Sequence, residues 1–489
     1  MSFETMDVEK EAVQEDDELQ TEPQATEGKS LENEYAGSPE NPRNWGRGKK
    51  VYHVGIVASY GFVVTFATSV YTPGITSVMA RFHVSETVGL FGLCFYTLGL
   101  GCGPIIAAPL SETYGRSIVY RVSLPIFALF ILGSGLAQNC TTLVVCRFMA
   151  GVFGGPALSV GGGTIADIWP RSLRAPATNF YALAPFLGPA IGPVIGGYVA
   201  ASKGWRWTQW AIIFFAIATF LFSLFIAETS KKILLRRHAA RLGLKADTTP
   251  KPKASVKTLL IVTLGRPCTM LATEPIVTFL SAYVGFNFAV LFSFFAAFRL
   301  IFGRVYGFDT GQIGLVFLAI GLGCLLGTAT GLLLDRLVYQ KHAGRAKHRE
   351  AVSAEHRLHG AMMGAFGLPI GLFWLAWTAR RDVHWASPVF AAVPFAWGNL
   401  TIFMSAVLYL VDMYGDLYGA SALAAIGFVR YLLAFAFPLF TIQMYDRLGI
   451  AWATSLLGFI SLLLLPIPWV LYKHGPRIRA RSAYQNVES

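Results

Sequence analysis

Apolar residues occur along the chain in long runs separated by short polar segments, as expected for helices that cross a bilayer. A spanning helix requires about 20 predominantly apolar residues. Twelve such stretches can be delimited, six on each side of a long polar segment: residues 51–73, 88–110, 117–137, 141–165, 176–200 and 208–227, then 271–297, 311–334, 360–379, 386–411, 420–442 and 451–472. The pattern predicts an all-α integral membrane protein with twelve transmembrane helices arranged as two six-helix halves.

The composition is that of a chain whose surface faces lipid. Charged residues make up 14% of the sequence and apolar residues 54%, with 37 Phe and 49 Gly, and the mean hydropathy is +0.51. Soluble domains carry about 25% charged residues, so this chain has too few to cover a water-facing surface. Bulky side chains suit lipid-facing positions, and small ones suit helix contacts. The composition therefore excludes a soluble protein.

The two ends of the chain and its longest polar segment are strongly charged. Residues 1–42 hold 13 acidic residues and two Lys without apolar periodicity, which predicts a disordered tail. The expected organisation is a disordered acidic tail at 1–45, a six-helix half at 46–227, a basic loop at 228–270, a second half at 271–472 and a short tail at 473–489. Part of the basic loop could lie as an amphipathic helix on an anionic leaflet; a solvated tether is the alternative.

Basic residues are distributed unevenly between the two sides of the predicted bundle. If both termini are cytoplasmic, 30 Lys and Arg fall on that side, 8 fall on the other, and only Arg147 and Arg430 fall within spans. Cytoplasmic segments of membrane proteins carry the excess of basic residues. The sequence therefore predicts a multi-pass protein with both termini cytoplasmic. We place it in the plasma membrane, and the vacuolar membrane is the alternative.

The fifth span carries glycine at every fourth position. Gly188, Gly192 and Gly196 recur at this spacing, with Pro189, Pro193 and Gly197 beside them. A spacing of four puts the three glycines on one helix face, where another helix can approach closely. Proline within a transmembrane helix is tolerated where neighbours satisfy the freed backbone groups. The span is therefore expected to be a tight helix contact.

Two arginines lie within predicted spans. Arg147 lies near the start of the fourth span and shares a helix face with Gly151. Such a guanidinium must face the bundle interior or a wet cavity, unless it extends to the outer headgroups; Arg430 in the eleventh span presents the same alternatives. Because Asp and Glu all lie near helix ends, the sequence does not identify a carboxyl that carries protons.

Uncharged polar and aromatic residues also lie within the spans. They could line a cavity that accepts bulky amphiphiles by stacking and sparse hydrogen bonding, or they could hold helices together. The candidates for the cavity are Tyr96, Asn179, Tyr181, Tyr283, Asn287, Trp397 and Asn399.

Other chemistry has no support in the sequence. The six cysteines form no CxxC pair and no Cys/His metal spacing, so no metal or cofactor is expected. The histidines lie at span ends or in loops and form no catalytic constellation, and no Walker loop is present. We therefore expect neither an enzyme nor an ATP-driven pump. The expected partners are a small-molecule substrate, protons and the bilayer, with no nucleic acid, for a chain that acts as a monomer.

Several of these motifs resemble signatures of the major facilitator superfamily. Between spans two and three, Leu110, Gly115 and Arg116 match the loop signature Gly-x-Leu-a-Asp-x-x-Gly-Arg, with Ala108 and Glu112 in place of its Gly and Asp. The segment that begins at Gly331 and ends with Asp335 and Arg336 resembles a decayed second copy of this loop signature. The fifth span is similar to the antiporter signature G-x-x-x-G-P-x-x-G-G, and Arg147 with Gly151 is similar to the family's Arg-x-x-x-Gly signature.

The resemblance is to the twelve-span drug:proton antiporters of fungi, a group that includes polyamine and multidrug exporters. It implies a secondary transporter that exports amphiphilic drugs, toxins, secondary metabolites or polyamines in exchange for protons, with Arg147 in proton coupling. It also implies that Leu110, Glu112, Gly115, Arg116, Asp335 and Arg336 control closure of the cytoplasmic side. Glu112 is expected near the start of span three, where a helix N-terminus favours negative charge. An importer or a nutrient sensor of the same superfamily is the alternative.

Overall fold

The computed structural model describes residues 34–242, 256–341 and 353–480 together with Ser482 and Tyr484, and within them it contains helices and no strand. Most of the predicted acidic tail and parts of both long polar loops lie outside the described residues. The first half consists of α3 (Arg47–Ser69), α4 (Ile75–Phe82), α5 (Glu86–Tyr114), α6 (Arg116–Leu136), α7 (Cys140–Gly154), α8 (Pro156–Ile168), α9 (Arg171–Lys203) and α10 (Arg206–Ser223).

The second half follows two connecting helices, α11 (Lys231–Arg241) and α12 (Val256–Thr273). It consists of α13 (Pro275–Phe298), α14 (Arg304–Tyr306), α15 (Thr310–Val316), α16 (Leu318–Leu334), α18 (His359–Thr378), α19 (Ala386–Leu464) and α20 (Ile467–Arg479). Short helical turns link these elements: η1 (Pro42–Asn44), η2 (Thr72–Gly74), η3 (Arg299–Gly303), η4 (Asp335–Tyr339) and η6 (Ala354–Leu358).

Two glycines divide the longest helical stretch into separate spans. The 79 residues of α19 would extend about 120 Å as one straight helix, four times the apolar thickness of a bilayer. Gly415 and Gly449 have φ of 63° and 75°, a conformation that glycine adopts at little cost and that ends a helix. Of the eleven apolar helical stretches in the described residues, the last therefore contains two spans. The prediction of a twelve-helix all-α membrane protein is confirmed.

Large apolar side chains cover the outside of the bundle. Among the most exposed are Phe225 at 80%, Leu463 at 79%, Leu129 at 65% and Phe214 at 64% of their surface. In water such a surface would drive aggregation, whereas lipid tails are as apolar as these side chains. The low charge content of the sequence is therefore explained by a surface that faces lipid.

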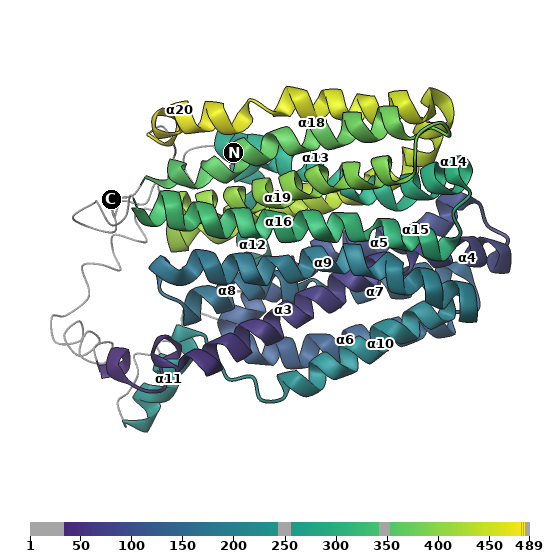
Figure 1. The fold of residues 1–489 in the computed structure, drawn as a ribbon. Helices are drawn as coiled ribbons and strands as arrows, with labels where there is room; N and C mark the ends of the chain where they lie inside the picture. Colours follow the sequence, from purple (N-terminus) through teal and green to yellow (C-terminus); the bar gives the residue numbers. More distant parts are fainter. Residues whose placement is uncertain (1–33, 243–255, 342–352, 481, 483, 485–489) are drawn as a thin grey trace.

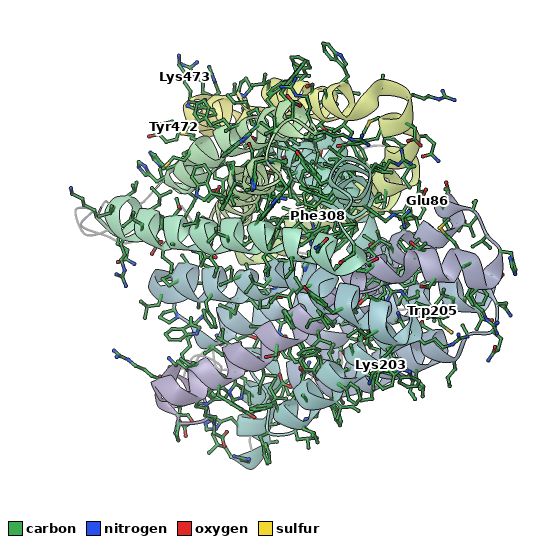
Figure 2. The ribbon with its side chains drawn as sticks, turned by 45° about the vertical axis from the view of Figure 1, so that its right-hand side comes forward. Glu86, Lys203, Trp205, Phe308, Tyr472 and Lys473 are labelled. Atoms are coloured by element: carbon green, nitrogen blue, oxygen red, sulfur yellow. The ribbon has the colours of Figure 1, made fainter. Side chains whose placement is uncertain are left out.

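The helices form two bundles that lie side by side (Figure 1). In this view α13, α16, α18, α19 and α20 make up the upper bundle and α3, α6, α7, α8, α9 and α10 the lower one. We name the two ends of the molecule by the helices found there: α11 lies at the left end (the α11 end), and α4 and α14 lie at the right end (the α4 end). Figure 2 shows Tyr472 and Lys473 far from Glu86 and Trp205, at the opposite end of the bundle.

The fifth span, α9, has two glycine-bearing faces. One face packs on α3 within the same half: a Cβ added at Gly192 would lie 1.9 Å from Ser69 Oγ, and one added at Gly196 would lie 2.4 Å from the carbonyl oxygen of Val70. Gly188 meets α3 in the same way, at Thr65. The three glycines thus let α3 and α9 touch backbone to backbone.

The other face of α9 meets the second half. A Cβ added at Gly314 on α15 would lie 2.3 Å from the carbonyl oxygen of Pro193, and one added at Gly197 would lie 2.7 Å from the carbonyl oxygen of Thr310. Pro189 lies buried on the same helix. The signature helix is therefore shared: its four-residue glycine repeat joins it to its own half, while Pro193 and Gly197 form contacts between the halves.

Candidate functional site

Arg147 is completely buried inside the first half. Its Nε donates to the carbonyl oxygen of Gly92 at 3.0 Å, and its terminal nitrogens lie 3.5 Å from the carbonyl oxygen of Thr68 and from Gln209 Oε1. The guanidinium carbon lies 4.7 Å from the ring centre of Tyr71 and 4.6 Å from that of Tyr96. No described carboxylate forms an ion pair with it.

These contacts explain how α7 can carry a charge in the membrane. Carbonyl oxygens and the faces of aromatic rings are both attractive to a cation. They come from α3, α5 and α10 as well as from the turn after α3, so Arg147 ties four spans together. Of the two orientations that the sequence allows, the structure has the one that faces the bundle interior.

Arg430 lies between the two halves in a cage of aromatic rings. Its guanidinium carbon is 4.5 to 5.0 Å from the ring centres of Phe288 on α13 and of Phe403 and Tyr431 on α19. Phe186 on α9 closes the cage from the first half, at 5.7 Å from Phe288 and 5.2 Å from Phe403 between ring centres. We call Phe186, Phe288, Phe403 and Tyr431 the aromatic cage.

The cage lacks the hydrogen-bond partners that surround Arg147. The Nε of Arg430 is buried without a partner among the described residues. Buried donors are normally satisfied, and leaving one unsatisfied costs about 1–3 kcal/mol. The cage therefore holds a guanidinium whose Nε donor is not used by the described residues.

Further buried polar atoms without partners lie on α13, the helix that supplies Phe288. Neither side-chain atom of Asn287 has a partner in the described part of the chain, and the hydroxyl of Tyr283 has none either. Residues four apart share a helix face, so Tyr283 and Asn287 project in the same direction. Asn399 Nδ2 donates to the backbone oxygen of Asn287 at 3.3 Å, which brings a third candidate of the sequence analysis to this point.

The other predicted cavity residues are dispersed. Tyr96 stacks on Arg147 and donates to the carbonyl oxygen of Val64 at 2.7 Å, inside the first half. The hydroxyl of Tyr181 lies 3.2 Å from the carbonyl oxygen of Leu158, and Trp397 Nε1 donates to Thr330 Oγ1 at 3.0 Å. Asn179 lies nearer the α11 end, in a cavity described below.

The loop signature between α5 and α6 is organised by a residue far along the chain. Glu228, which follows α10, accepts hydrogen bonds from the backbone N–H of Arg116 at 2.8 Å and from the hydroxyl of Ser117 at 2.8 Å. Gly115 has φ of 104°, and a Cβ there would lie 2.2 Å from Glu228 Oε2. Glycine is therefore required at this turn both by the backbone and by the carboxylate.

Glu228 takes the place that the sequence suggested for Glu112. Glu112 lies exposed in the last turn of α5, whereas Glu228 lies at the positive N-terminal end of α6. Burial acts to raise the pKa of Glu228, but hydrogen bonds from the N–H groups of Ser230 and Arg116 outweigh it, so the pKa lies below its ordinary value of 4.5. The expected helix-end anion is present and is supplied by another residue.

Arg116 of the loop signature pairs with an acid on another helix. Its Nε lies 3.2 Å from Asp167 Oδ2 at the end of α8, and its Nη1 lies 3.2 Å from Ser111 Oγ. Leu110 is 44% exposed and forms no part of this charged cluster. The pair links α6 to α8 within the first half.

The corresponding end of the second half carries a buried charge cluster. Arg357 on η6 lies 2.9 Å from Asp335 Oδ1 and 2.7 Å from Asp412 Oδ2, with its guanidinium over the ring of Tyr339. Arg336, the neighbour of Asp335 in the decayed signature, is exposed. The basic partner of Asp335 is therefore Arg357, 22 residues further on, which sequence spacing could not indicate.

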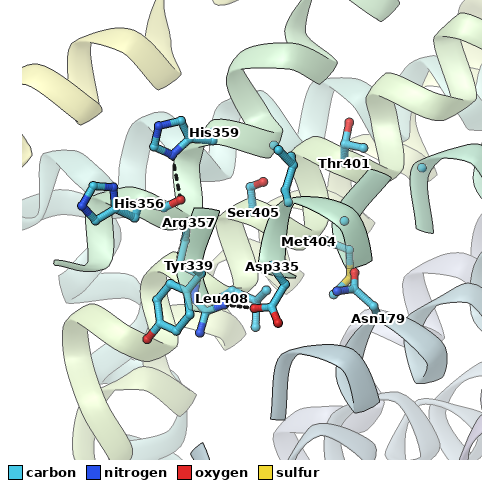
Figure 3. Close-up of a pocket in the computed structure, with 14 residues that line it drawn as sticks. Asn179, Asp335, Tyr339, His356, Arg357, His359, Thr401, Met404, Ser405 and Leu408 are labelled. Atoms are coloured by element: carbon cyan, nitrogen blue, oxygen red, sulfur yellow. Dashed lines mark hydrogen bonds and ion pairs between the residues drawn. The ribbon is translucent and has the colours of Figure 1, made fainter. Parts of the chain in front are cut away.

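A small cavity of about 40 Å³ opens beside this cluster (Figure 3). Asp335 and Arg357 line it from the second half, and Asn179 approaches from α9 of the first half. The space suffices for a few water molecules but lies far below the 300–1,000 Å³ of a drug-sized site. We interpret it as a hydrated seam between the halves.

At the α4 end, polar side chains connect the two halves directly. Arg299 on η3 pairs with Glu86 at the start of α5, and its Nη1 donates to Thr76 Oγ1 at 3.2 Å. Gln443 and Thr87 lie 3.1 Å apart. We call Arg299, Glu86 and Thr76 the α4-end clasp.

One acid near the α11 end is buried without an ion pair in the described residues. Glu274, directly before α13, is 3% exposed and accepts a hydrogen bond from the hydroxyl of Tyr414 at 2.9 Å. Its position at a span boundary gave no sign of this in the sequence.

Comparison with known proteins places this architecture in a family. The family model of the Major Facilitator Superfamily matches residues 57–438. Polyamine transporter 4 of Saccharomyces cerevisiae is 40% identical over 474 residues, covering 91% of this chain and 72% of that protein. Efflux pump radE of Floropilus chiversii is 34% identical over 454 residues, covering 91% of this chain and 84% of that protein.

A solved structure agrees with the fold. The proton:xylose symporter XylE, bound to 6-bromo-6-deoxy-D-glucose, superposes with a TM-score of 0.63 at 15% identity and covers 88% of this chain and 96% of that chain. This likeness concerns the fold alone. Taken with the family match and the two relatives, it shows that the chain is a membrane transporter rather than an enzyme, and that it belongs to the major facilitator superfamily.

Proposed function

We propose that this protein exports amphiphilic small molecules, such as drugs, fungal secondary metabolites or toxins, or polyamines, in exchange for protons. The observation that carries the proposal is the aromatic cage. Phe186, Phe288 and Arg430 each lie near the middle of their helices, so the cage lies at mid-membrane between the halves. Transporters of this kind bind substrate near the midplane at the interface between repeats.

The halves can rock about this point. Contacts through Gly197, Pro193 and Gly314 bring backbones together without long side chains between them, so little has to repack when the halves tilt. The α4-end clasp closes one end in this structure. The clusters around Arg116 and Asp335 lie at the other end, where they would order the helix termini that open and close.

Export and orientation have their own support. Relatives at 34–40% identity are named as an efflux pump and a polyamine transporter. The α11 end carries the basic helix Lys231–Arg241, which favours a cytoplasmic location for that end. We therefore place both termini in the cytoplasm and the protein in the plasma membrane, acting as a monomer.

Proton exchange requires a group that gains and loses a proton during the cycle. We propose Glu274 for this role, because it is buried beside Tyr414 at the cytoplasmic end of α13 and has no described counter-ion. Intramembrane ionisable residues are functional by default. Arg147 would act on the proton indirectly, since its positive charge in the first half disfavours protonation of groups nearby.

Transport into inside-out plasma-membrane vesicles tests the proposal. Azoles, fungal toxins and polyamines are offered with and without an acidic lumen, using vesicles from cells that lack the protein as the baseline. We expect accumulation that requires the pH gradient and is lost in Glu274→Gln, with exposed Asp382→Asn, in the polar segment before α19, as the matched control. Accumulation only in right-side-out vesicles would indicate an importer, and binding without any transport would indicate a sensor.

A further inference from the structure

We propose that Arg430 is the contact for an anionic group of the substrate, so that the preferred cargo is an aromatic organic anion such as an aryl carboxylate. This inference rests on the proposed function and deepens it, because it selects among amphiphiles by charge. It starts from the charges that face the centre of the membrane.

The centre of this transporter contains positive charge without negative charge. Arg430 lies near the middle of its span, Arg147 lies nearer the α4 end, and every Asp and Glu in the described spans lies near a helix end. An isolated charge in a low-dielectric medium is strongly disfavoured unless an opposite charge accompanies it. A cationic substrate would add a further positive charge beside Arg430, whereas an anion would neutralise the one already present.

The two arginines differ in their capacity to bind that anion. Arg147 uses its nitrogens on Gly92, Thr68 and Gln209 inside one half. The guanidinium of Arg430 lies over three aromatic rings and forms no hydrogen bond with a described residue, and its Nε has no partner there. A guanidinium fork binds carboxylate through two parallel hydrogen bonds, and Arg430 has this fork available at the interface where substrate passes.

The surroundings of Arg430 favour an anion with an aromatic body. Phe186, Phe288 and Phe403 form a run of ring contacts that extends from the first half to the second. A planar ring of the substrate can replace one of these edge-to-face or tilted partners with similar energy. The unpartnered amide of Asn287, next to Phe288, supplies both a donor and an acceptor for a further polar group.

Binding of three ligands with one ring system tests the role of charge. The full-length protein in detergent micelles is titrated with 1-naphthoate (anion), 1-naphthamide (neutral) and 1-naphthylmethylammonium (cation), and with spermidine. We expect wild-type protein to bind the anion most tightly and the cation most weakly. Tighter binding of the cation or of spermidine than of 1-naphthoate would overturn the proposal.

Variants of Arg430 test the residue. Loss of a charged hydrogen-bond pair corresponds to roughly 10- to 100-fold in affinity, so Arg430→Gln should weaken 1-naphthoate binding by at least about tenfold and 1-naphthamide binding by less than about twofold. Arg430→Lys, which keeps the charge and loses the fork, should give an intermediate loss. Exposed Arg447→Gln is the matched control and should bind like wild type. Unchanged 1-naphthoate binding in Arg430→Gln would refute the assignment.

Transport of the same ligands separates this inference from the proposed function. If 1-naphthoate binds through Arg430 but does not accumulate in inside-out vesicles under a pH gradient, proton-driven export fails and the Arg430 assignment stands. If spermidine accumulates while 1-naphthoate neither binds nor competes, export stands and the Arg430 assignment fails. Should Arg430→Gln not reach the membrane, Arg430→Lys and Asn287→Asp decide the matter. The carboxylate added by Asn287→Asp should weaken binding of 1-naphthoate and strengthen binding of 1-naphthylmethylammonium.

Discussion

Arg147 and Arg430 are both arginines within apolar spans, yet their environments are opposite. Arg147 is held inside one half by two carbonyl oxygens, an amide and two tyrosine rings. Arg430 lies between the halves with rings around it and an Nε without a partner. The first arrangement uses all three nitrogens of the guanidinium, and the second leaves at least the Nε donor without a described partner.

The difference shows that a charge in the membrane can serve two purposes. A satisfied guanidinium holds helices together, because removing it leaves buried acceptors unpaired. An unsatisfied one at an interface costs stability and therefore calls for a functional explanation. Stability and binding measurements should consequently separate the two residues.

The largest expected effect is on the stability of the Arg147 site. Arg147→Gln should lower the free energy of unfolding by about 2–4 kcal/mol, since Gly92 and Thr68 lose their donor in a dry environment. Arg430→Gln should change it by less than about 1 kcal/mol. Unfolding in mixed micelles with increasing SDS measures the free energy of unfolding of both variants against wild type. Equal losses in the two variants would show that the sites do not differ as described.

Glycines beside the two arginines give a second, smaller contrast. A Cβ at Gly92 would lie 2.5 Å from the ring of Tyr71, which stacks on Arg147 and is fixed by a hydrogen bond to the carbonyl oxygen of Gly89. Gly92→Ala should therefore cost about 2 kcal/mol, typical of overpacking.

At Gly285 the nearest atoms are the methyl ends of Leu433 and Val429, at 2.9 and 3.0 Å. These side-chain ends can move, so Gly285→Ala should cost less than about 1 kcal/mol. Thermal unfolding in micelles, followed with a thiol-reactive dye, compares the two variants. A larger loss for Gly285→Ala would reverse our view of which site is rigid.

Glu228 offers a buried charge that titrates, unlike a guanidinium. Its pKa is lower in the folded protein than the ordinary value of 4.5, so its stabilisation is present above that value and is lost as the pH falls through the lower folded pKa. Glu228→Gln should cost about 1–2 kcal/mol at pH 7, as expected for a helix-end cap.

The stability gap between wild type and Glu228→Gln should shrink as the pH falls below about 4.5. The gap caused by Arg147→Gln should stay constant over this range, because arginine remains protonated. Melting temperatures at pH 7, 5 and 4 measure both gaps. A Glu228 gap that is unchanged at pH 4 would contradict the assignment of a charged cap.

The smallest expected effect comes from two tyrosine hydroxyls. Tyr96 donates to the carbonyl oxygen of Val64 at 2.7 Å, so Tyr96→Phe should cost about 1 kcal/mol. The hydroxyl of Tyr283 is buried without a described partner, so Tyr283→Phe should be neutral or slightly stabilising. Melting curves of the wild type and both variants test the two expectations. A clear loss of thermal stability in Tyr283→Phe would reveal a partner for that hydroxyl.

The fold could be predicted from the sequence because lipid imposes it. Apolar runs of fixed length locate the spans, and the predicted 117–137 and 360–379 coincide with α6 and α18 to within one residue. Gly188, Gly192 and Gly196 also identified a close contact, although the sequence could not name α3 as the partner. These features depend on local spacing, which a sequence displays directly.

The charged clusters could not be predicted in full, because their members are brought together only by folding. Glu228 reaches the N-terminus of α6 from more than 100 residues away, and Arg357 reaches Asp335 from another helix. Trp397, a cavity candidate, instead bonds Thr330. Side-chain type indicated which residues needed partners, and tertiary structure determined which partners they have.

The α4-end clasp also makes the composition of the surrounding water part of the transport cycle. Arg299 and Glu86 are 32% and 27% exposed, so dissolved ions reach them, and at physiological ionic strength charges are screened over about 8 Å. Rising salt weakens such a pair, whereas it strengthens an apolar seal. The ionic strength of the solution at the α4 end is therefore expected to change how often this end of the molecule opens.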